Sequence, residues 1–215
     1  MRDDTPPLTP DLLLQAYRTG VFPMSESRDD PDVFWVRPHM RGVMPLDKFH
    51  ISRSLAKTLR RGHFTVTINA AFTDVVRGCA NRDETWINDT IFDLYAALHA
   101  RGDAHSVEVW EDHQLVGGVY GVAINAAFFG ESMFSTATDA SKVALAYLVD
   151  HLQQCGFVLF DTQFITEHLT RLGAIEIPRA TYENALAHAV MRPARFKGVL
   201  SATAQDVIQR NAQTS

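Results

Sequence analysis

The sequence contains little cysteine and no long apolar run. Its 2 cysteines, Cys79 and Cys155, lie far apart and form no CxxC motif. This spacing argues against a disulfide framework and against a structural zinc site, so no metal is expected. No apolar stretch approaches the roughly 18–20 residues that a membrane-spanning helix needs, and the acidic, proline-rich start lacks the layout of a secretory signal. These absences predict a cytoplasmic protein with reduced thiols and no membrane partner.

A general excess of positive charge is also absent. Lysine and arginine total 20 against 25 aspartates and glutamates. This balance argues against indiscriminate nucleic-acid binding, and no DNA partner is expected. However, residues 37–61 carry 7 basic side chains and 1 acidic one. Four of the basic residues share one side of a predicted helix: Arg53, Lys57, Arg60 and Arg61. This side is either a solvated helix face or a local site for a phosphate backbone.

Capping residues and hydrophobic periodicity predict a mixed set of helices and strands. Helices are expected over residues 10–19, 53–61, 90–101, 140–155, 167–172 and 178–190. Strands are expected over residues 63–68, 105–111, 114–124, 126–134 and 157–164. Asp89 is the expected cap of the third helix, residues 21–32 are expected to form a loop, and the polar end from Ser201 is expected to fray.

The order of these elements indicates an α+β protein. Three successive antiparallel strands, a long helix, a further central strand and more helices resemble the acyltransferase fold of the N-acetyltransferase superfamily. The expected division is a small N-terminal domain over 1–38, an acyltransferase-like domain over 39–203 and a polar tail over 204–215. That fold grips coenzyme A with a glycine-rich turn, and no glycine occurs between Glu131 and Cys155. No acyl-coenzyme A donor, and no other cofactor, is therefore expected.

Three polar side chains stand out in apolar surroundings. Glu131 lies inside the run FFGESMF, where a carboxylate is costly unless it is paired or used. Asp161 and Gln163, two residues apart on the next strand, are expected to share a face and to meet Glu131 at the strand ends. Each has a structural alternative: Glu131 could pair with Lys142, while Asp161 could cap a turn beside an exposed Gln163.

Several motifs together resemble those of the leucyl/phenylalanyl-tRNA–protein transferase family. The chain contains AYRTGVFP, TWI, GESMFS, DASK, DTQF and HLTRLGAIEIPR in the family's order, and the match runs from about Leu12 to Tyr182. Members of this family transfer Leu or Phe from aminoacyl-tRNA to the N-terminal Arg or Lys of a protein, which marks that protein for degradation. The resemblance therefore implies aminoacyl-tRNA and such proteins as partners, with Met as a further amino acid to consider.

The resemblance also implies roles for the three polar residues. Gln163 would accept a hydrogen bond from the attacking amine, and Asp161 would orient and polarise the Gln163 amide. Glu131 would lie beside the aminoacyl-adenosine site and hold the donor or a cationic acceptor. Both strand residues are expected to be partly exposed in a cleft. Whether Gln163, Asp161 or the tRNA ribose takes the proton is left open.

Matching to the family further implies two binding regions. The aminoacyl pocket would be formed by Val119, Phe128, Met133, Phe134, Leu145, Leu148 and Leu152. The terminal adenosine would stack on Trp86, with Met24 in place of a tryptophan that is usual in the family, and the basic helix would contact the tRNA. The family's usual D-C-Q is Asp161-Thr162-Gln163 here, and the Thr162 side chain is expected to face away from the other two.

Two other functions remain open on the sequence. One is an N-acyltransferase of the same fold with another acyl donor. The other is a non-catalytic tRNA-binding module, against which the joint presence of Glu131, Asp161 and Gln163 argues.

Overall fold

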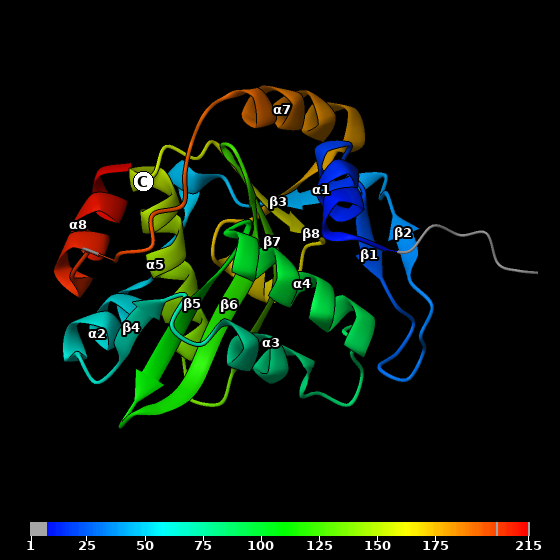
Figure 1. Ribbon diagram of the computed structural model, residues 1–215. Helices are drawn as coiled ribbons and strands as arrows, with labels where there is room; N and C mark the ends of the chain where they lie inside the picture. The colour runs from blue at the N-terminus through cyan, green and yellow to red at the C-terminus, as the bar shows by residue number, and fades with distance from the viewer. Residues whose placement is uncertain (1–7, 201, 215) are drawn as a thin grey trace, which may run out of the picture.

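A seven-stranded sheet forms the centre of the computed structural model, which describes residues 8–200 and 202–214 (Figure 1). Residues 1–7 of the expected N-terminal domain, Ser201 and Ser215 lie outside the described residues. The strands follow the order β4 (Thr65–Ile68), β5 (Ala104–Glu111), β6 (Gln114–Ile124), β7 (Ala127–Ser135), β8 (Leu159–Gln163), β3 (Met40–Val43) and β9 (Ile175–Pro178). A separate pair consists of β1 (Phe22–Met24) and β2 (Phe34–Val36).

The predicted meander and central strand are confirmed. Strands β5, β6 and β7 pair antiparallel in sequence order. The chain then crosses through α5 (Ala140–Gln154) and returns as β8, which runs parallel to β7 and lies between β7 and β3. This crossover places β8 beside the first half of β7, so the end of β8, with Asp161 and Gln163, comes near Glu131 in the middle of β7 rather than at its carboxyl end.

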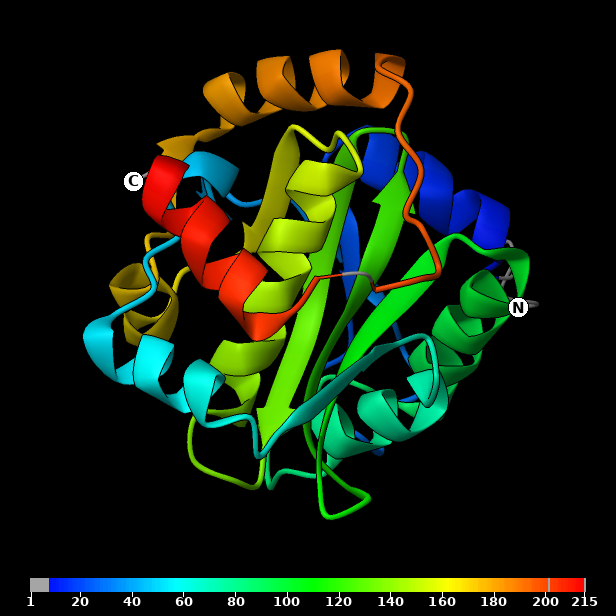
Figure 2. The ribbon, with the colours of Figure 1, turned by 90° about the vertical axis from the view of Figure 1, so that its left-hand side faces the viewer.

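Helices cover both faces of the sheet (Figures 1 and 2). One face carries α5 together with α2 (Arg53–Arg61), α8 (Ala204–Thr214) and the short 3₁₀ helix η1 (Leu46–Lys48). The other face carries α1 (Pro10–Arg18), α3 (Phe72–Ala80), α4 (Asp89–Arg101) and α7 (Arg179–Met191), and α6 (Glu167–Arg171) follows β8. Each face has its own apolar cluster. In the part of the chain that is described, no helix combines the length and the apolar character needed to cross a membrane.

Local sequence explains where most helices begin. The side chains of Thr9 and Ser52 accept hydrogen bonds from the first turns of α1 and α2, as expected from N-capping residues. The prediction that Asp89 caps α4 is wrong by one residue. Asn88 is the cap, since its Oδ1 accepts from the Ile91 N–H at 2.8 Å, and Asp89 is the first helical residue.

Two further expectations are corrected by tertiary contacts. The segment 21–32 is not entirely a loop, because Phe22–Met24 pairs with Phe34–Val36. The polar end does not fray between Ala204 and Thr214: it forms α8, which lies against α5 (Figure 2). Val207 is buried, and Arg210 binds both carboxylate oxygens of Asp150 at 2.6 and 2.8 Å. Apolar packing, this ion pair and hydrogen bonds of Asn211 to the backbone of Phe49 and Ile51 thus hold a helix whose composition is mostly polar.

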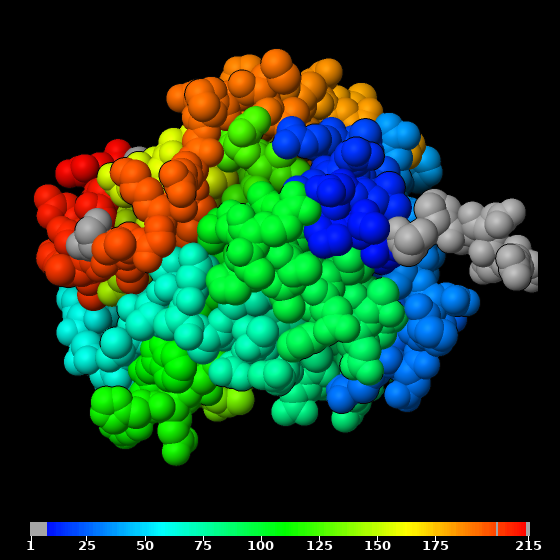
Figure 3. Space-filling view, viewed as in Figure 1, coloured from blue at the N-terminus to red at the C-terminus, as the bar shows by residue number. Residues whose placement is uncertain are grey.

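The space-filling view shows how this end of the chain closes the molecule. Helix α7 and the segment after it, coloured orange, run over the top of the protein and down toward α8 at its edge (Figure 3). Phe196 in this segment is buried and stacks on His105 and Phe128. The segment therefore covers the apolar cluster on the α5 face.

Candidate active site

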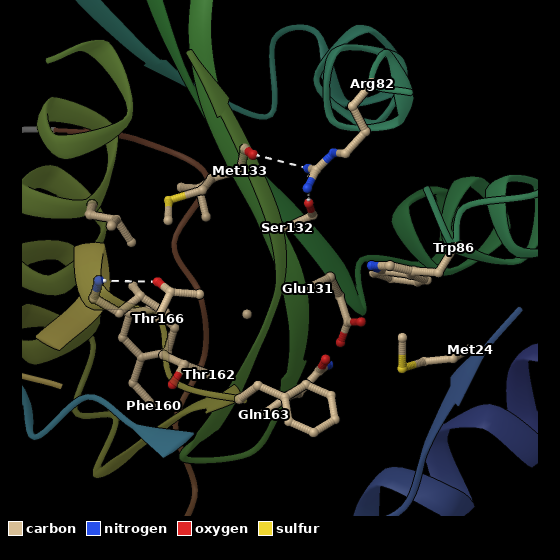
Figure 4. Close-up of a pocket in the computed structure, with 15 residues that line it drawn as sticks. Met24, Arg82, Trp86, Glu131, Ser132, Met133, Phe160, Thr162, Gln163 and Thr166 are labelled. Atoms are coloured by element: carbon tan, nitrogen blue, oxygen red, sulfur yellow. Dashed lines mark hydrogen bonds between the residues drawn. The ribbon is translucent and has the colours of Figure 1, made fainter. Parts of the chain in front are cut away.

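A cavity of about 260 Å³ opens where β7 and β8 lie side by side. Its walls come from β1, β6, β7, α5, β8 and α6 and from the loop before α4. The lining residues are Met24, Arg82, Trp86, Val119, Gly130, Glu131, Ser132, Met133, Leu145, Phe160, Thr162, Gln163, Phe164, Thr166 and Leu169. Met133 and Phe160 stand on one side of the cavity and Trp86 and Met24 on the other, with Glu131 and Gln163 between them (Figure 4).

The structure brings together only part of the set predicted from the sequence. Of the seven residues expected to line an aminoacyl pocket, Val119, Met133 and Leu145 do so. Three of the other four, Phe128, Leu148 and Leu152, are buried in the cluster on the α5 face, and Phe134 is partly buried against the cluster on the other face. Apolar residues at helical spacing continue along α5 beyond the cavity, and strand alternation turns Phe134 toward α3, where its ring contacts Gly78. Trp86 and Met24, expected at the adenosine site, both line the cavity.

Glu131 sits on a β-bulge. Gly130 pairs with Gly121 and Ser132 with Tyr120, so Glu131 has no partner on β6 and is the extra residue of β7. A bulge of this kind redirects a side chain, and here four successive residues from Gly130 to Met133 reach the cavity wall. The bulge explains how a strand that is apolar on both faces can present a carboxyl group.

Two tyrosines, rather than a lysine, hold the Glu131 side chain. The hydroxyl oxygens of Tyr17 and Tyr95 lie within hydrogen-bond distance of Oε1 and Oε2, each at 2.6 Å. The alternative pairing with Lys142 is wrong, because Lys142 binds Asp139 at 2.7 Å. Burial raises the pKa of the Glu131 carboxyl to about 7, against the opposite effect that hydroxyl donors have on an ionised carboxylate.

Asp161 is fully buried and Gln163 is only 6% exposed, contrary to the expectation that both are partly exposed in a cleft. Its two oxygens accept from Arg41 at 2.9 and 2.6 Å, and Oδ2 also accepts from the Tyr182 hydroxyl at 2.6 Å. Arg41 lies between the rings of Phe22 and Tyr182 and donates to the Gly20 carbonyl. Although burial lowers the pKa of the Arg41 guanidinium, Asp161 raises it above its usual value. The ion pair therefore joins β3, β8, α7 and the N-terminal segment.

Gln163 lies at a sharp turn that ends β8. Its φ is 61°, and the Phe164 N–H donates to the Thr162 carbonyl at 2.7 Å. This combination is a classic γ-turn, a strained conformation that is uncommon outside functional sites. Because of the turn, Thr162, Gln163 and Phe164 all line the cavity instead of alternating between faces. Thr162 was expected to face away from its two neighbours, and this turn is the reason that it does not.

Two close contacts support the turn. The Gln163 N–H donates to Asp161 Oδ1 at 2.8 Å, so Asp161 contacts the backbone of Gln163 rather than its side-chain amide. Gly42 on β3 allows the second contact, because a Cβ there would lie 2.7 Å from the Phe164 carbonyl carbon. A residue larger than glycine would push β3 away from the turn.

The Gln163 side chain points toward Glu131 (Figure 4). Its Nε2 is buried and has no hydrogen-bond partner among the described residues. A buried amide group without a partner costs free energy, and its persistence is typical of a group that meets a ligand. Among the described residues that line the cavity, Gln163 and Thr162 thus each carry a buried polar atom with unused hydrogen-bonding capacity.

Several residues of the site were missed by sequence reasoning. Arg82 donates to Ser132 Oγ at 2.9 Å and to the Cys79 carbonyl at 2.8 Å, and it lines the cavity between α3 and Trp86. Arg41 could have been found by the signal that singled out Glu131, namely one charge among apolar neighbours. Tyr17 follows Leu13 on the buried face of α1. No comparable signal marks Tyr95, Tyr182 or Phe164.

The basic residues of α2 are exposed. Thr58 of this helix donates to Asp139 at 3.2 Å, which fixes α2 against the start of α5. Leu145 of the cavity lies less than two turns further along α5. A polymer bound along α2 could therefore reach the cavity without crossing the sheet.

The cavity combines two chemical characters. Its apolar walls can enclose a branched or aromatic side chain, while Gln163 and Glu131 offer hydrogen bonds to an amine or a carbonyl group. Among the described residues, no three His, Cys, Asp or Glu side chains come together as metal ligands would. The arrangement suits positioning and hydrogen-bonding chemistry.

Comparison with known proteins assigns the family. The model of the family described as leucyl/phenylalanyl-tRNA protein transferase matches residues 43–187, and the model of that family's N-terminal domain matches residues 7–39. The leucyl/phenylalanyl-tRNA–protein transferase of Cereibacter sphaeroides is 61% identical over 213 residues, which cover 98% of this chain and 100% of the relative. The protein of the same name from Ruegeria pomeroyi is 59% identical over 208 residues, which cover 97% and 99% of the two chains.

A solved structure agrees on the fold. The crystal structure of FemX superimposes with a TM-score of 0.51 at 12% identity, covering 78% of this chain and 66% of that one. At this identity the likeness concerns the fold alone, and the chain has the predicted α+β acyltransferase fold. The two matched models and the close relatives show that this chain belongs to the leucyl/phenylalanyl-tRNA–protein transferase family.

Proposed function

We propose that the protein transfers Leu or Phe, with Met as a third candidate, from aminoacyl-tRNA to the N-terminal Arg or Lys of acceptor proteins. The extended N-terminus would then serve as a degradation signal. The proposal rests on the closeness of apolar side chains to a polar amide in one cavity. The apolar side chains of Val119, Met133 and Leu145 line the same cavity as Gln163. A Leu or Phe side chain held there would leave its ester carbonyl close to a group that can orient an amine.

The reaction needs positioning more than activation, because the aminoacyl ester is already reactive. The acceptor α-amine attacks the ester carbonyl carbon, so that a C–N bond forms and the bond from that carbon to the ribose oxygen breaks. The amine loses a proton and the ribose oxygen gains one. The carbonyl oxygen of the Gln163 amide would accept a hydrogen bond from the amine, and Asp161 would hold Gln163 in place through its backbone N–H.

The donor would occupy the rest of the cavity and the surface beside it. The terminal adenine would stack on Trp86, with Met24 supplying a further apolar contact. The exposed basic side chains of α2 would contact tRNA phosphates. Glu131, beside Gln163, would favour a cationic acceptor over an acidic one.

Transfer assays test this proposal against its two alternatives. The protein is incubated with labelled Leu-tRNA, Phe-tRNA or acetyl-coenzyme A, and with peptides that begin with Arg, Lys or Asp. We expect label from both tRNAs on the Arg and Lys peptides and none on the Asp peptide. Label from acetyl-coenzyme A would indicate an N-acyltransferase instead. Binding of tRNA without any transfer would indicate a non-catalytic module.

The basic helix gives a second prediction. The double change Arg60→Ala and Arg61→Ala is expected to weaken tRNA binding and to reduce the slope of log affinity against log salt by about 1.5. Each lost phosphate contact removes about 0.7–0.9 from that slope. The matched control changes Arg77 and Arg101, two exposed arginines on α3 and α4 at the other face, to Ala. An unchanged slope in the α2 variant would indicate that the basic side of α2 is a solvated helix face that contacts no phosphate.

A further inference from the structure

Three oxygen-bearing groups form a closed ring beside the cavity. The Tyr17 and Tyr95 hydroxyls each lie 2.6 Å from an oxygen of Glu131, and the two hydroxyl oxygens lie 2.7 Å from each other. The tyrosines come from α1 and α4, and both are fully buried. All three distances are those of O–H···O hydrogen bonds.

The ring can be examined by counting its protons. Two tyrosine hydroxyls supply two protons, whereas the ring contains three contacts. If Glu131 is ionised, both hydroxyls donate to it, and the 2.7 Å contact between the tyrosines has no proton. If Glu131 is protonated, its own O–H donates to one tyrosine, that tyrosine donates to the other, and the second donates back to the carboxyl group. Only the neutral acid gives each contact one proton.

The surrounding charges agree with a neutral carboxyl group. Arg41 lies on β3, which is separated from β7 by β8, and Asp161 already pairs with it. Arg82 donates to Ser132 and to main-chain carbonyls. Asp161 itself adds a negative charge, and Tyr120 on β6 places an unpartnered hydroxyl in the same buried region. Among the described residues, no cation forms an ion pair with Glu131.

We propose that Glu131 rests as a neutral carboxylic acid and that Tyr17 and Tyr95 are positioning residues that hold it in this state by closing a ring of three hydrogen bonds. One consequence rests on the proposed function. A cationic acceptor terminus would be attracted fully only after Glu131 has released its proton to solvent. Discrimination against acidic termini would then increase as the pH rises.

Infrared difference spectroscopy of the resting protein tests the ring directly. A protonated, buried carboxyl group has a carbonyl stretching band that the ionised form lacks. Because burial raises the pKa of Glu131 to about 7, we expect this band at pH 6 and not at pH 8. The band should be absent at both pH values in Glu131→Gln. That variant keeps one N–H donor and one acceptor in the ring, so its fold should survive.

The variants Tyr17→Phe and Tyr95→Phe decide what the tyrosines do. When Glu131 is neutral, removing one tyrosine hydroxyl breaks two ordinary hydrogen bonds of the ring. When Glu131 is ionised, the same change breaks one charge-assisted hydrogen bond, which is about twice as strong as an ordinary one. These losses nearly cancel. The change also removes the unfavourable contact between the two hydroxyl oxygens that has no proton when Glu131 is ionised. The pH at which half of the band is lost (its midpoint) should therefore fall by about half to one unit.

If the tyrosines were simple donors to a carboxylate, the same changes would raise the midpoint instead. Tyr120→Phe is the matched control, because the Tyr120 hydroxyl makes no hydrogen bond to any described residue, and the midpoint of this variant should equal that of the unchanged protein. Three results would overturn the proposal: no band at pH 6, a midpoint that is unchanged or higher in both Phe variants, or an equal shift in the control. A protein with the expected band but without transferase activity would refute the proposed function alone.

Discussion

Replacing Asp161 by Asn is expected to lower the free energy of unfolding by about 3–5 kcal/mol. The change removes the negative partner of Arg41, whose side chain is only 2% exposed. A buried charge without a counter-charge is strongly destabilising, since the ion can neither reach water nor lose its proton at this position. The measurement is urea denaturation, with the midpoint and the slope reported for each variant.

Two variants make this expectation specific. Asp74→Asn breaks an exposed pair with Arg77 and should change the free energy of unfolding by less than about 0.5 kcal/mol. Adding Arg41→Met to Asp161→Asn removes the stranded charge, so the double variant should lose less stability than the two single variants together. A change of less than about 1 kcal/mol in Asp161→Asn would contradict a structural role for the pair.

This expectation differs from the one that the sequence supports. The spacing of Asp161 and Gln163 predicts that both lie on one face of a strand, and in the structure both do lie near Glu131. What the spacing could not reveal is Arg41, which is distant in sequence and belongs to a short strand with no periodic signal. Burial of Asp161 depends on that pairing, so it follows from tertiary structure.

The irregular backbone of the site was also beyond sequence reasoning. Regular alternation would turn Thr162 away from Gln163 and Ser132 away from Glu131, yet all four line one cavity. A bulge in β7 and a γ-turn at the end of β8 produce this result. Neither position carries a glycine at the residue that bends, and such irregularities have no sequence pattern of their own.

Charge within an apolar run was the most informative local signal. It drew attention to Glu131, whose buried carboxyl group lines the cavity, while capping side chains such as Thr9 and Ser52 mark where helices begin. The sequence was less informative for Leu148 and Leu152, which lie in the core. Apolar residues at helical spacing look the same in the sequence whether they line a cavity or pack in the core. The distinction depends on where α5 passes the sheet.

Gln163→Ala is expected to lower kcat by about 10²–10³-fold while leaving aminoacyl-tRNA binding nearly unchanged. The range is that found when one preorganised hydrogen-bonding group is removed from an active site. The fold should survive, because Asp161 contacts the backbone N–H of Gln163, which alanine retains. The donor would be held by other groups: the apolar walls, Trp86 and α2.

Single-turnover kinetics with preformed Leu-tRNA separate the chemical step from donor binding. Gln114→Ala, which removes an exposed amide at the turn between β5 and β6, is the matched control and should retain full kcat. A loss in donor affinity that accounts for the whole effect would assign Gln163 to binding. If kcat is retained in a folded Gln163→Ala protein, the Gln163 amide does not orient the amine.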